Sequence, residues 1–467
     1  DRVAISSKAG RGTRAKSLGN ETRYRLVGAS GPGFSEDGVL RNPGLNSEIH
    51  GLNQRLRVPI FIIFDEGCSY VEDTRKLQPT IMFKLAVLSL SLLTLMSNSA
   101  VSPALGEISD YFCFAGKSLI HLIPVAHSLT IVPTIFFVGR LSRVFPGKAL
   151  LVFGLSVFTL SGTVGGLVSN IFTLLLTRLF MGFGLGLVIP FSTALISDFF
   201  EGDEKTRLMG LSSSLNMFGG MIALLVAGQL ASFSWRLPFL IYSFGIPVLG
   251  LTIRYLPNLA ISATEEATAG TGPGKSILPI VLSMFLFNLV FFILTPTMAF
   301  YLRYSGLGDS RVTGMVIASA NIGGFAAGIL LPQTRKTLGK YFIPVVLFSI
   351  GIGFILLSKA TLIAVVFLGT IVIGFANRSI YPLFFLKVTE NTTPTEAIRR
   401  TSLLSTMVYL GQFMAPIFQQ FVGIAFQRPD IRFLYGFVAV LSIAASFPFF
   451  TYSSIKRENA LQATKKE

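Results

Sequence analysis

Residues 171–195 read IFTLLLTRLFMGFGLGLVIPFSTAL, a run in which one charged side chain, Arg178, stands among apolar and small residues. A helix needs about twenty predominantly apolar residues to cross the hydrocarbon core of a membrane. Gly182 and Gly186 lie one helical turn apart in this run and permit close contact with a neighbouring helix. The stretch therefore predicts a membrane-spanning helix that packs inside a larger bundle.

Runs of the same kind recur along the chain from Met82. They fall near 82–104, 119–139, 148–168, 171–195, 208–232, 237–256, 277–301, 311–332, 341–358, 361–386, 401–425 and 433–454. Composition agrees, because 51% of the 467 residues are hydrophobic and only 13% are charged, whereas soluble domains carry charge at about a quarter of their positions. The pattern predicts an all-α membrane protein of twelve transmembrane helices in two six-helix bundles.

The apolar runs divide the chain into five regions. Residues 1–81 are polar and rich in Gly, Ser and Arg, and we interpret them as a disordered tail or as a mis-extended reading frame whose natural start is Met82. Peptides from 1–75 in the expressed protein would rule out the start at Met82. The other regions are a first bundle, a cytoplasmic linker, a second bundle and a cytoplasmic tail, at 82–257, 258–276, 277–455 and 456–467.

The charge distribution predicts the orientation in the membrane. The net charge is +16, and Lys and Arg accumulate in cytoplasmic loops of membrane proteins, so we attribute the excess to the loops and not to nucleic-acid binding. Basic residues gather after spans two and eight, at Arg140, Arg143, Lys148, Arg335, Lys336 and Lys340. We therefore expect a multi-pass protein of the cell membrane (the inner membrane in a Gram-negative cell) with both termini in the cytoplasm.

The two halves of the chain repeat each other at a constant offset of 192 residues. The matched pairs are Arg143 with Arg335, Gly147 with Gly339, Lys148 with Lys340, Gly182 with Gly374, Pro190 with Pro382, Glu204 with Glu396, Arg207 with Arg399 and Gly219 with Gly411. Two six-span halves in parallel orientation are typical of one large class of secondary transporters. An ancestral duplication in a non-transporting protein is the alternative.

Two motifs resemble the major facilitator superfamily, over nearly all of 82–454. The loop GRLSRVFPGK at 139–148 is similar to the family signature G-x-L-[AS]-D-R-x-G-R-K, with Arg143 in place of the Asp and Pro146 in place of the second Gly. Span four, from Leu174 to Gly186, is similar to the family pattern L-x-x-x-R-x-x-x-G-x-G. The resemblance implies two bundles related by a pseudo-twofold axis along the membrane normal, which rock about a mid-depth cavity.

The resemblance also implies roles for individual residues. In the family the loop after span two latches the cytoplasmic side, which makes a gating loop of Gly139, Arg140, Arg143, Lys148, Asp198 and Arg207. The departure at Arg143 puts the usual charge pairing of that latch in doubt. In proton-coupled members the arginine of span four is associated with proton transfer, which singles out Arg178. Its alternative role is that of an arginine reaching the membrane surface.

The direction of transport is only partly indicated. The segment after span four and the Trp235-Arg236 pair resemble the drug-efflux branch of the family. The antiporter signature of span five would read G-x8-G-x3-G-P-x2-G-G, and three of its glycines are present here, at Gly210, Gly219 and Gly228, without the central Gly-Pro. Efflux is favoured by the part of the signature that matches, whereas the missing Gly-Pro is consistent with import.

Proton coupling requires a titratable group inside the membrane, and no Asp or Glu lies in the middle of a predicted span. His127 does lie within span two, and histidine changes charge in the physiological range. We therefore take His127 and Arg178 as the proton-coupling candidates. A neutral histidine packed between helices is the alternative for His127.

Polar side chains within the spans are candidates for the substrate cavity. They are Asn98, Asn216, Asn288, Asn321, Asn377, Arg378 and Gln412. Each could instead bond to another helix, and Arg378 could pair with a helix carbonyl. Arg378 stands at the repeat position of Gly186, and a buried positive charge there favours an anionic or zwitterionic substrate.

These patterns favour a secondary active transporter that exports a small organic solute in exchange for protons. An importer or facilitator of an organic anion or other metabolite is the first alternative, and a non-transporting membrane receptor is the second. We expect no enzyme, cofactor or metal, because two cysteines and three histidines form no metal-ligand spacing and no catalytic or nucleotide-binding pattern is present. The expected partners are the solute, protons and lipid, and we expect a monomer.

Overall fold

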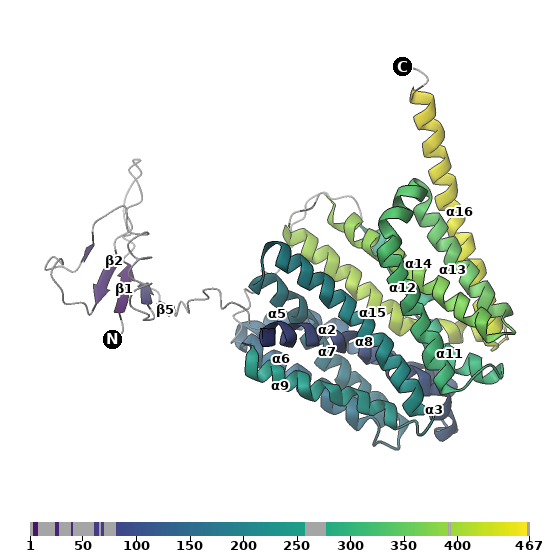
Figure 1. The fold of residues 1–467 in the computed structure, drawn as a ribbon, viewed down its shortest axis with the longest axis horizontal. Coiled ribbons are helices and arrows are strands. Elements are labelled where there is room, and N and C mark those ends of the chain that lie inside the picture. Colours follow the sequence, from purple (N-terminus) through teal and green to yellow (C-terminus); the bar gives the residue numbers. More distant parts are fainter. Residues whose placement is uncertain are drawn as a thin grey trace. The chain divides into compact units, whose positions relative to one another are not determined.

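The computed structural model describes residues 3–7, 24–27, 39–40, 60–64, 67–69, 81–256, 277–390, 392 and 394–464, with the backbone alone for 451–464. The chain divides into two compact units, Asp1–Pro79 and Thr80–Glu467. Strands belong to the first unit and helices to the second (Figure 1). The predicted linker 258–276 and the side chains of the predicted tail 456–467 lie outside the described residues.

The first unit carries a five-stranded sheet in the order β3-β2-β1-β4-β5. The strands are β1 (Val3–Ser7), β2 (Tyr24–Val27), β3 (Val39–Leu40), β4 (Ile60–Phe64) and β5 (Gly67–Ser69). β1 pairs with β4 in parallel, and the other neighbours are antiparallel. The strands fall within 1–81, for which a disordered tail or a mis-extended frame stays a prediction to be checked on the expressed protein.

All regular secondary structure among the described residues of the second unit is helical. The first half holds α2 (Ile81–Ser99), η1 (Ser102–Ala104), α3 (Leu105–Tyr111), α4 (Lys117–Leu122), α5 (His127–Val144), α6 (Gly147–Val164), α7 (Ile171–Phe199), α8 (Gly202–Ala231), η2 (Leu237–Phe244) and α9 (Gly245–Tyr255). The second half holds α10 (Leu278–Phe291), α11 (Leu294–Tyr304), α12 (Ser310–Leu338), η3 (Gly339–Tyr341), α13 (Phe342–Lys359), α14 (Ile363–Thr389), α15 (Pro394–Ala425) and α16 (Ile431–Thr464).

Nine helical stretches of the described chain are long and apolar enough to cross a membrane, and one of them, Ser310–Lys359, covers both α12 and α13. α5 and α15 are helical over predicted spans two and eleven but fall outside the nine, since polar and basic residues dilute their apolar character. Every predicted span is thus helical. The predicted all-α membrane fold of twelve helices in two bundles is confirmed.

Spans one and seven are broken, which the sequence did not predict. α2 ends at Ser99 and is followed by η1 and α3, and α10 ends at Phe291 and is followed by α11. Ser99 and Phe291 are themselves 192 residues apart. The break is therefore a repeated feature, and short or interrupted helices at matching positions of two halves are a feature of transporter binding regions.

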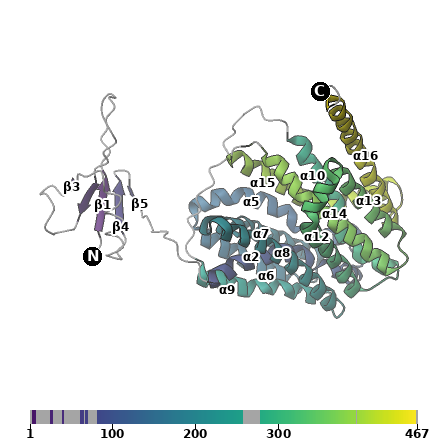
Figure 2. The same ribbon diagram turned by 45° about the horizontal axis from the view of Figure 1, so that its top comes forward.

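Two pairs of long helices lie at the junction of the halves. α5 contacts α15, and α8 contacts α12, and the helices of both pairs lie side by side in Figures 1 and 2. At the offset of 192 residues, α12 is the repeat equivalent of α4 and α5, and α15 is the repeat equivalent of α8. The two pairs are thus equivalent under the repeat. Of these four helices, α5 and α15 are the two that fall outside the nine apolar stretches.

Glycines at repeat positions fix the closest helix contacts. A Cβ added at Gly182 of α7 would lie 2.0 Å from the carbonyl oxygen of His127, and one added at Gly374 of α14 would lie 1.9 Å from that of Ala320. No side chain fits at either position. α7 therefore packs on α5 as α14 packs on α12, which supports the repeat in three dimensions.

Helices α8 and α12 pack closely at one end of the bundle and are more exposed at the other. We call the end that carries α3 and α4 the α3–α4 end, and the opposite end, where α9 ends and α10 begins, the linker end. Added Cβ atoms at Gly228 and Gly314 would lie 2.8 Å and 2.5 Å from backbone oxygens of the partner helix. Buried residues of α8 lie mainly at 219–231 and those of α12 at 310–327, so both helices become exposed toward the linker end.

Candidate functional site

Two arginines lie well inside helices of the second unit, Arg178 in α7 and Arg378 in α14. The sequence analysis singled out both as functional candidates. Their surroundings differ in which half of the chain they contact and in how many partners they have.

Arg178 is enclosed by the first half of the chain and is 1% exposed. Its Nη2 donates to the carbonyl oxygen of Gly162 at 3.2 Å and its Nη1 to Sδ of Met181 at 3.4 Å. The guanidinium carbon lies 4.6 Å from the ring centre of Phe239 and 4.9 Å from that of Tyr242, and both aromatic faces attract the charge. We call these five residues the Arg178 cluster. The side chain is enclosed by protein on all sides.

The Arg178 cluster holds four elements together. The hydroxyl of Tyr242 in η2 donates to the carbonyl oxygen of Ser97 in α2 at 3.0 Å. A Cβ added at Gly165 would lie 2.5 Å from Nη2 of Arg178 and 2.8 Å from the ring of Phe239, so no side chain fits beside the cluster there. The cluster links α2, α6, α7 and η2, all within the first half.

His127 begins α5 and is 1% exposed. Neither of its ring nitrogens has a hydrogen-bond partner among the described residues. Thr130, one turn along α5, donates to the carbonyl oxygen of Leu179 at 2.7 Å and ties α5 to α7. The imidazole also interacts electrostatically with Arg178. The structure therefore brings the two predicted coupling residues into one region, and their role in coupling stays a prediction.

Arg378 lies near the middle of α14, where the two halves meet. A Cβ added at Gly324 of α12 would lie 2.6 Å from Cγ of Arg378 and 3.1 Å from Cε of Met217 in α8. The ring centre of Tyr381, one turn along α14, lies 5.9 Å from the guanidinium carbon. The hydroxyl of Tyr381 donates in turn to Oδ1 of Asn288 in α10. We call these five residues the Arg378 cluster.

Two of the predicted cavity asparagines bond within their own half. Asn216 donates to Oγ1 of Thr94 at 2.9 Å and so joins α8 to α2. Asn288 is fully buried and donates to the carbonyl oxygen of Met284 at 2.8 Å. Only Asn288 also belongs to the Arg378 cluster.

The remaining cavity candidates differ in burial. Asn377 is 2% exposed, and its Nδ2 has no hydrogen-bond partner in the described part of the chain. Gln412 is 1% exposed. Asn321 is half-buried and lies one turn before Gly324 on the same face of α12. The side chain of Asn98 lies outside the described residues. These placements leave a substrate role for each of them as a prediction.

Polar pairs join the two halves at the α3–α4 end. They are Asp110 with Arg303 (2.5 Å), Ser232 with Arg311 (2.9 Å) and His121 with Gln419 (3.0 Å). The side chains of Asp110 and Arg303 are 61% and 46% exposed, and exposed ion pairs contribute about 0–1 kcal/mol. Contacts of this strength can close an entrance and still be broken in each cycle.

The predicted gating loop lies at the linker end. Nζ of Lys148 donates to the carbonyl oxygen of Ile253 at 2.8 Å and ties α6 to α9. The guanidinium carbon of Arg140 lies 6.0 Å from the ring centre of Phe137. The other members are exposed or have open space around them: Gly139, Arg143, Asp198 and Arg207. The latch itself stays a prediction.

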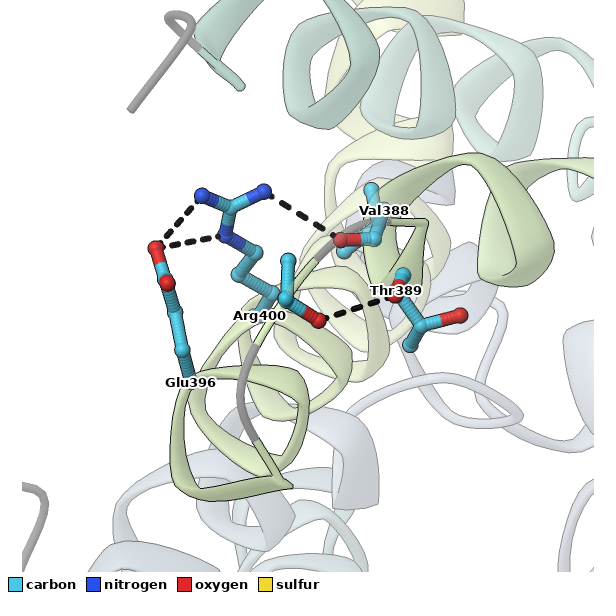
Figure 3. Close-up of polar contacts among 5 residues, drawn as sticks. Val388, Thr389, Glu396 and Arg400 are labelled. Atoms are coloured by element: carbon cyan, nitrogen blue, oxygen red, sulfur yellow. Dashed lines mark hydrogen bonds and ion pairs between the residues drawn. The ribbon is translucent and has the colours of Figure 1, made fainter. Parts of the chain in front are cut away.

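The repeat-related acidic residues at the linker end have different partners. Glu396 accepts from Nη2 and Nε of Arg400 at 2.5 and 3.0 Å, and Nη1 of Arg400 donates to the carbonyl oxygen of Val388 at 3.4 Å (Figure 3). Glu204 instead pairs with Lys84 of α2. The sequence analysis matched the two glutamates but missed both basic partners, because a repeat does not specify which basic residue lies nearby.

The described residues line cavities that include three toward the ends of the bundle. The largest, of about 800 Å³, lies at the α3–α4 end, and charged residues on its wall include Lys117, Arg428, Asp430 and Arg432. A second, of about 690 Å³, lies at the linker end among α12, α13 and α14. The third, of about 380 Å³, lies between α3 and α11. None of these three is the mid-depth cavity that the sequence predicted.

Comparison with known proteins gives a family match over most of the chain. Residues 87–416 match the model of the Major Facilitator Superfamily. This confirms the predicted resemblance and the expectation of a transport-type membrane protein in place of an enzyme.

Curated relatives include exporters. A cephamycin export protein of Amycolatopsis lactamdurans is 31% identical over 35% of this chain and 34% of its own length. A multidrug efflux protein of Bacillus subtilis is 26% identical over 71% of this chain and 84% of its own length. The chain spans about a third of the length of the first curated relatives it matches.

Solved structures share the fold. A nucleoside transporter matches with a TM-score of 0.64 at 12% identity, covering 79% of this chain and 99% of its own. A bacterial homologue of the human lysosomal transporter Spinster matches with a TM-score of 0.58 at 17% identity, covering 79% of this chain and 94% of its own.

Proposed function

We propose that this chain, which belongs to the Major Facilitator Superfamily, is a secondary transporter that exports a small organic solute across the cell membrane in exchange for protons. The observation that carries the proposal is the junction of two repeat-related halves, packed at the α3–α4 end and exposed toward the linker end. A junction of related halves whose helices pack at one end and are more exposed at the other fits the rocking of two halves that underlies alternating access.

Rocking of one half against the other would exchange the open end. The contacts that must break at the α3–α4 end are a few polar pairs, such as Asp110 with Arg303. No covalent or buried ionic link has to be cut among these pairs. The two equivalent helix pairs supply a matching set of contacts for the opposite state.

Export is supported by the names of relatives, which include a cephamycin export protein and a multidrug efflux protein. Basic residues gather at the linker end, and the positive-inside rule assigns that end to the cytoplasm. With both termini there, the exposed faces of α8 and α12 would receive solute from the cytoplasm, and the α3–α4 end would release it outside.

Proton coupling would involve His127 and Arg178. An ionisable residue buried within a membrane protein is a functional candidate because its burial is costly. His127 has unpartnered ring nitrogens and interacts with Arg178, so a change in its proton would act on the one charged group beside it.

Import or facilitated movement of a metabolite is the second candidate. The half-present antiporter signature of span five favours it, because the central Gly-Pro is replaced by Ala223-Leu224. If the protein imports or equilibrates a metabolite, the two halves would rock in the same way, but no exchange with protons would drive export.

Uptake into inverted membrane vesicles, with and without an uncoupler, tests the proposal on a mixed panel of drugs and organic anions. Uncoupler-sensitive accumulation is the expected result. Equilibration without accumulation would support a facilitator, and an absence of flux relative to vesicles that lack the protein would contradict transport of the panel.

A further inference from the structure

The Arg378 guanidinium has no ionic partner among the residues that the structure describes. In the described part of the chain it makes no hydrogen bond or ion pair, and its one polar neighbour is the ring of Tyr381 at 5.9 Å. Cation–π attraction is effective only within about 6 Å of the ring centre. A half-buried charge without a partner is costly, so its presence calls for a compensating group that arrives from elsewhere.

Among the described residues, no carboxylate lies near the middle of the bundle. Among the residues whose side chains are described, acidic ones occur in α3, at the ends of α7, α8, α14 and α15, and in the loops before α12 and α16. With no described carboxylate beside Arg378, a bound anion is the group that would compensate its charge.

The surroundings of Arg378 suit an organic anion. The guanidinium presents paired donors that match the two oxygens of a carboxylate or a sulfonate. Asn321, one turn from Gly324 on α12, is half-buried and forms no hydrogen bond among the described residues. The hydroxyl of Tyr381 is already engaged by Asn288. Arg378 supplies the charge, and Asn321 is free to bond the rest of the molecule.

The position of Arg378 couples binding to both halves. Its stem lies beside Gly324 of α12 and within reach of Met217 of α8, so a molecule held there contacts the junction that rocking rearranges. Any side chain at position 324 would push against this stem.

A second basic surface lies on the route to the α3–α4 end. The cavity of about 800 Å³ at that end is lined by Lys117 and Arg428, both exposed, and by Arg432 against the single carboxylate of Asp430. Arg432 is partly engaged, since it donates to the carbonyl oxygen of Ala360 at 3.2 Å. The net positive wall attracts anions and raises their local concentration.

We infer that the transported solute carries an anionic group of the carboxylate or sulfonate type, which Arg378 binds at the junction of the two halves. This inference rests on the proposed transport function and adds the substrate class and the residue that selects it.

The test uses three probes with one ring system and different charge. They are 2-naphthalenesulfonate, 2-naphthalenesulfonamide and 2-naphthyltrimethylammonium, each offered to inverted vesicles that contain the full chain. Because the sulfonate and ammonium charges do not change with pH, a proton gradient cannot trap these two probes by protonation. Binding is measured in parallel from the thermal unfolding temperature of the purified protein with each probe.

We expect the wild type to accumulate the sulfonate in preference to the other probes. Arg378→Gln should raise the half-saturating concentration of sulfonate by about 10- to 100-fold, the range for a lost charged hydrogen bond. Arg378→Lys should recover part of the loss. The control is Arg254→Gln, which removes an exposed positive charge in the last turn of α9 and should leave transport unchanged.

Each of the other outcomes contradicts either the inferred anion site or the proposed transport function. Accumulation of the ammonium or sulfonamide but not of the sulfonate overturns the anion inference and leaves transport standing. Loss of all probes alike in Arg378→Gln gives the arginine a structural role and also overturns the inference. Stabilisation by sulfonate without accumulation, lost in Arg378→Gln, keeps the anion site and contradicts transport. Neither accumulation nor stabilisation contradicts both.

Discussion

The Arg178 cluster and the Arg378 cluster place the same residue type inside the helices of two related halves, with opposite outcomes. Arg178 is 1% exposed, bonds to Gly162 and Met181, and lies between two aromatic rings. Arg378 is half-buried at the junction of the halves and has one ring at the limit of attraction.

The repeat makes the difference informative. The counterpart of Arg178 is Thr370, which bonds to Ser319 at 2.7 Å, and the counterpart of Arg378 is Gly186, which packs on Thr134. Neither arginine has a charged residue at the equivalent position of the other half. A charge whose partners come from its own half serves the integrity of that half, whereas a charge without partners at the junction is available to a ligand.

The largest expected effect is that of Arg178→Ala. Removing a fully buried side chain from between Phe239 and Tyr242 should cost about 2–5 kcal/mol of unfolding free energy, and we expect gradient-driven transport to be lost. Thermal unfolding in detergent and vesicle transport per folded molecule are the measurements. Arg378→Ala is the matched control and should cost less than about 1 kcal/mol.

Two outcomes would break the contrast between the arginines. Equal destabilisation by Arg178→Ala and Arg378→Ala would mean that both charges are structural. Normal driven transport by folded Arg178→Ala protein would remove Arg178 from the coupling site.

A smaller effect is expected at the glycines that seat the two helices. Gly182→Ala and Gly374→Ala each place a Cβ against a carbonyl oxygen, at 2.0 and 1.9 Å, and should each cost about 1–3 kcal/mol through overpacking. We expect Gly374→Ala to weaken anion binding more, because α14 carries Arg378. Gly139→Ala is the control, since nothing lies within 4 Å of its added Cβ. Equal binding losses from both variants would contradict the assignment.

The substitution His127→Asn tests whether the region around Arg178 couples transport to protons. Asparagine keeps a polar group of similar reach but cannot take up a proton near neutral pH. We expect the pH dependence of transport to flatten, with a stability change below about 1 kcal/mol. Transport rates across a pH series provide the check, and an unchanged profile would retire His127 as a coupling residue.

The smallest effect is expected at the α3–α4 end. Asp110→Asn removes one member of an exposed ion pair and should shift the balance between open and closed states by less than about 1 kcal/mol, or about fivefold. In a background with Cys68→Ser and Cys113→Ser, a maleimide that cannot cross membranes would report the accessibility of Asn321→Cys. Arg254→Gln is the control, and a slower labelling rate in Asp110→Asn would contradict a closing role for the pair.

The helical part of the fold could be predicted because lipid imposes a length and a composition on each span. The repeat and the seats at Gly182 and Gly374 could be predicted because a glycine at a tight crossing leaves a mark in both halves. The breaks after Ser99 and Phe291 could not, since apolar residues continue across both of them.

The candidate site was predicted only in part. Arg178, Arg378 and His127 could be found because charge within a span is rare. The partners that decide what each charge does, such as Phe239 and Tyr242, come from segments distant in sequence. No spacing rule connects them, so the contrast between the two arginines emerges only in three dimensions.

The close contact of Gly228 with Gly314 divides α8 into a long and a short part, and the helix could pivot at this point. From this fulcrum, the arm toward Gly202 is about 39 Å long at about 1.5 Å per residue, and the arm toward Ala231 is about 5 Å long. A tilt of about 10° then moves the far tip by about 7 Å and the near tip by less than about 1 Å, by the same rise per residue. In the proposed rocking motion, a tilt about this contact would widen the linker end by about the width of a small organic molecule while the α3–α4 end stays closed. The absence of side chains at Gly228 and Gly314 is what lets the two helices meet closely enough to pivot there.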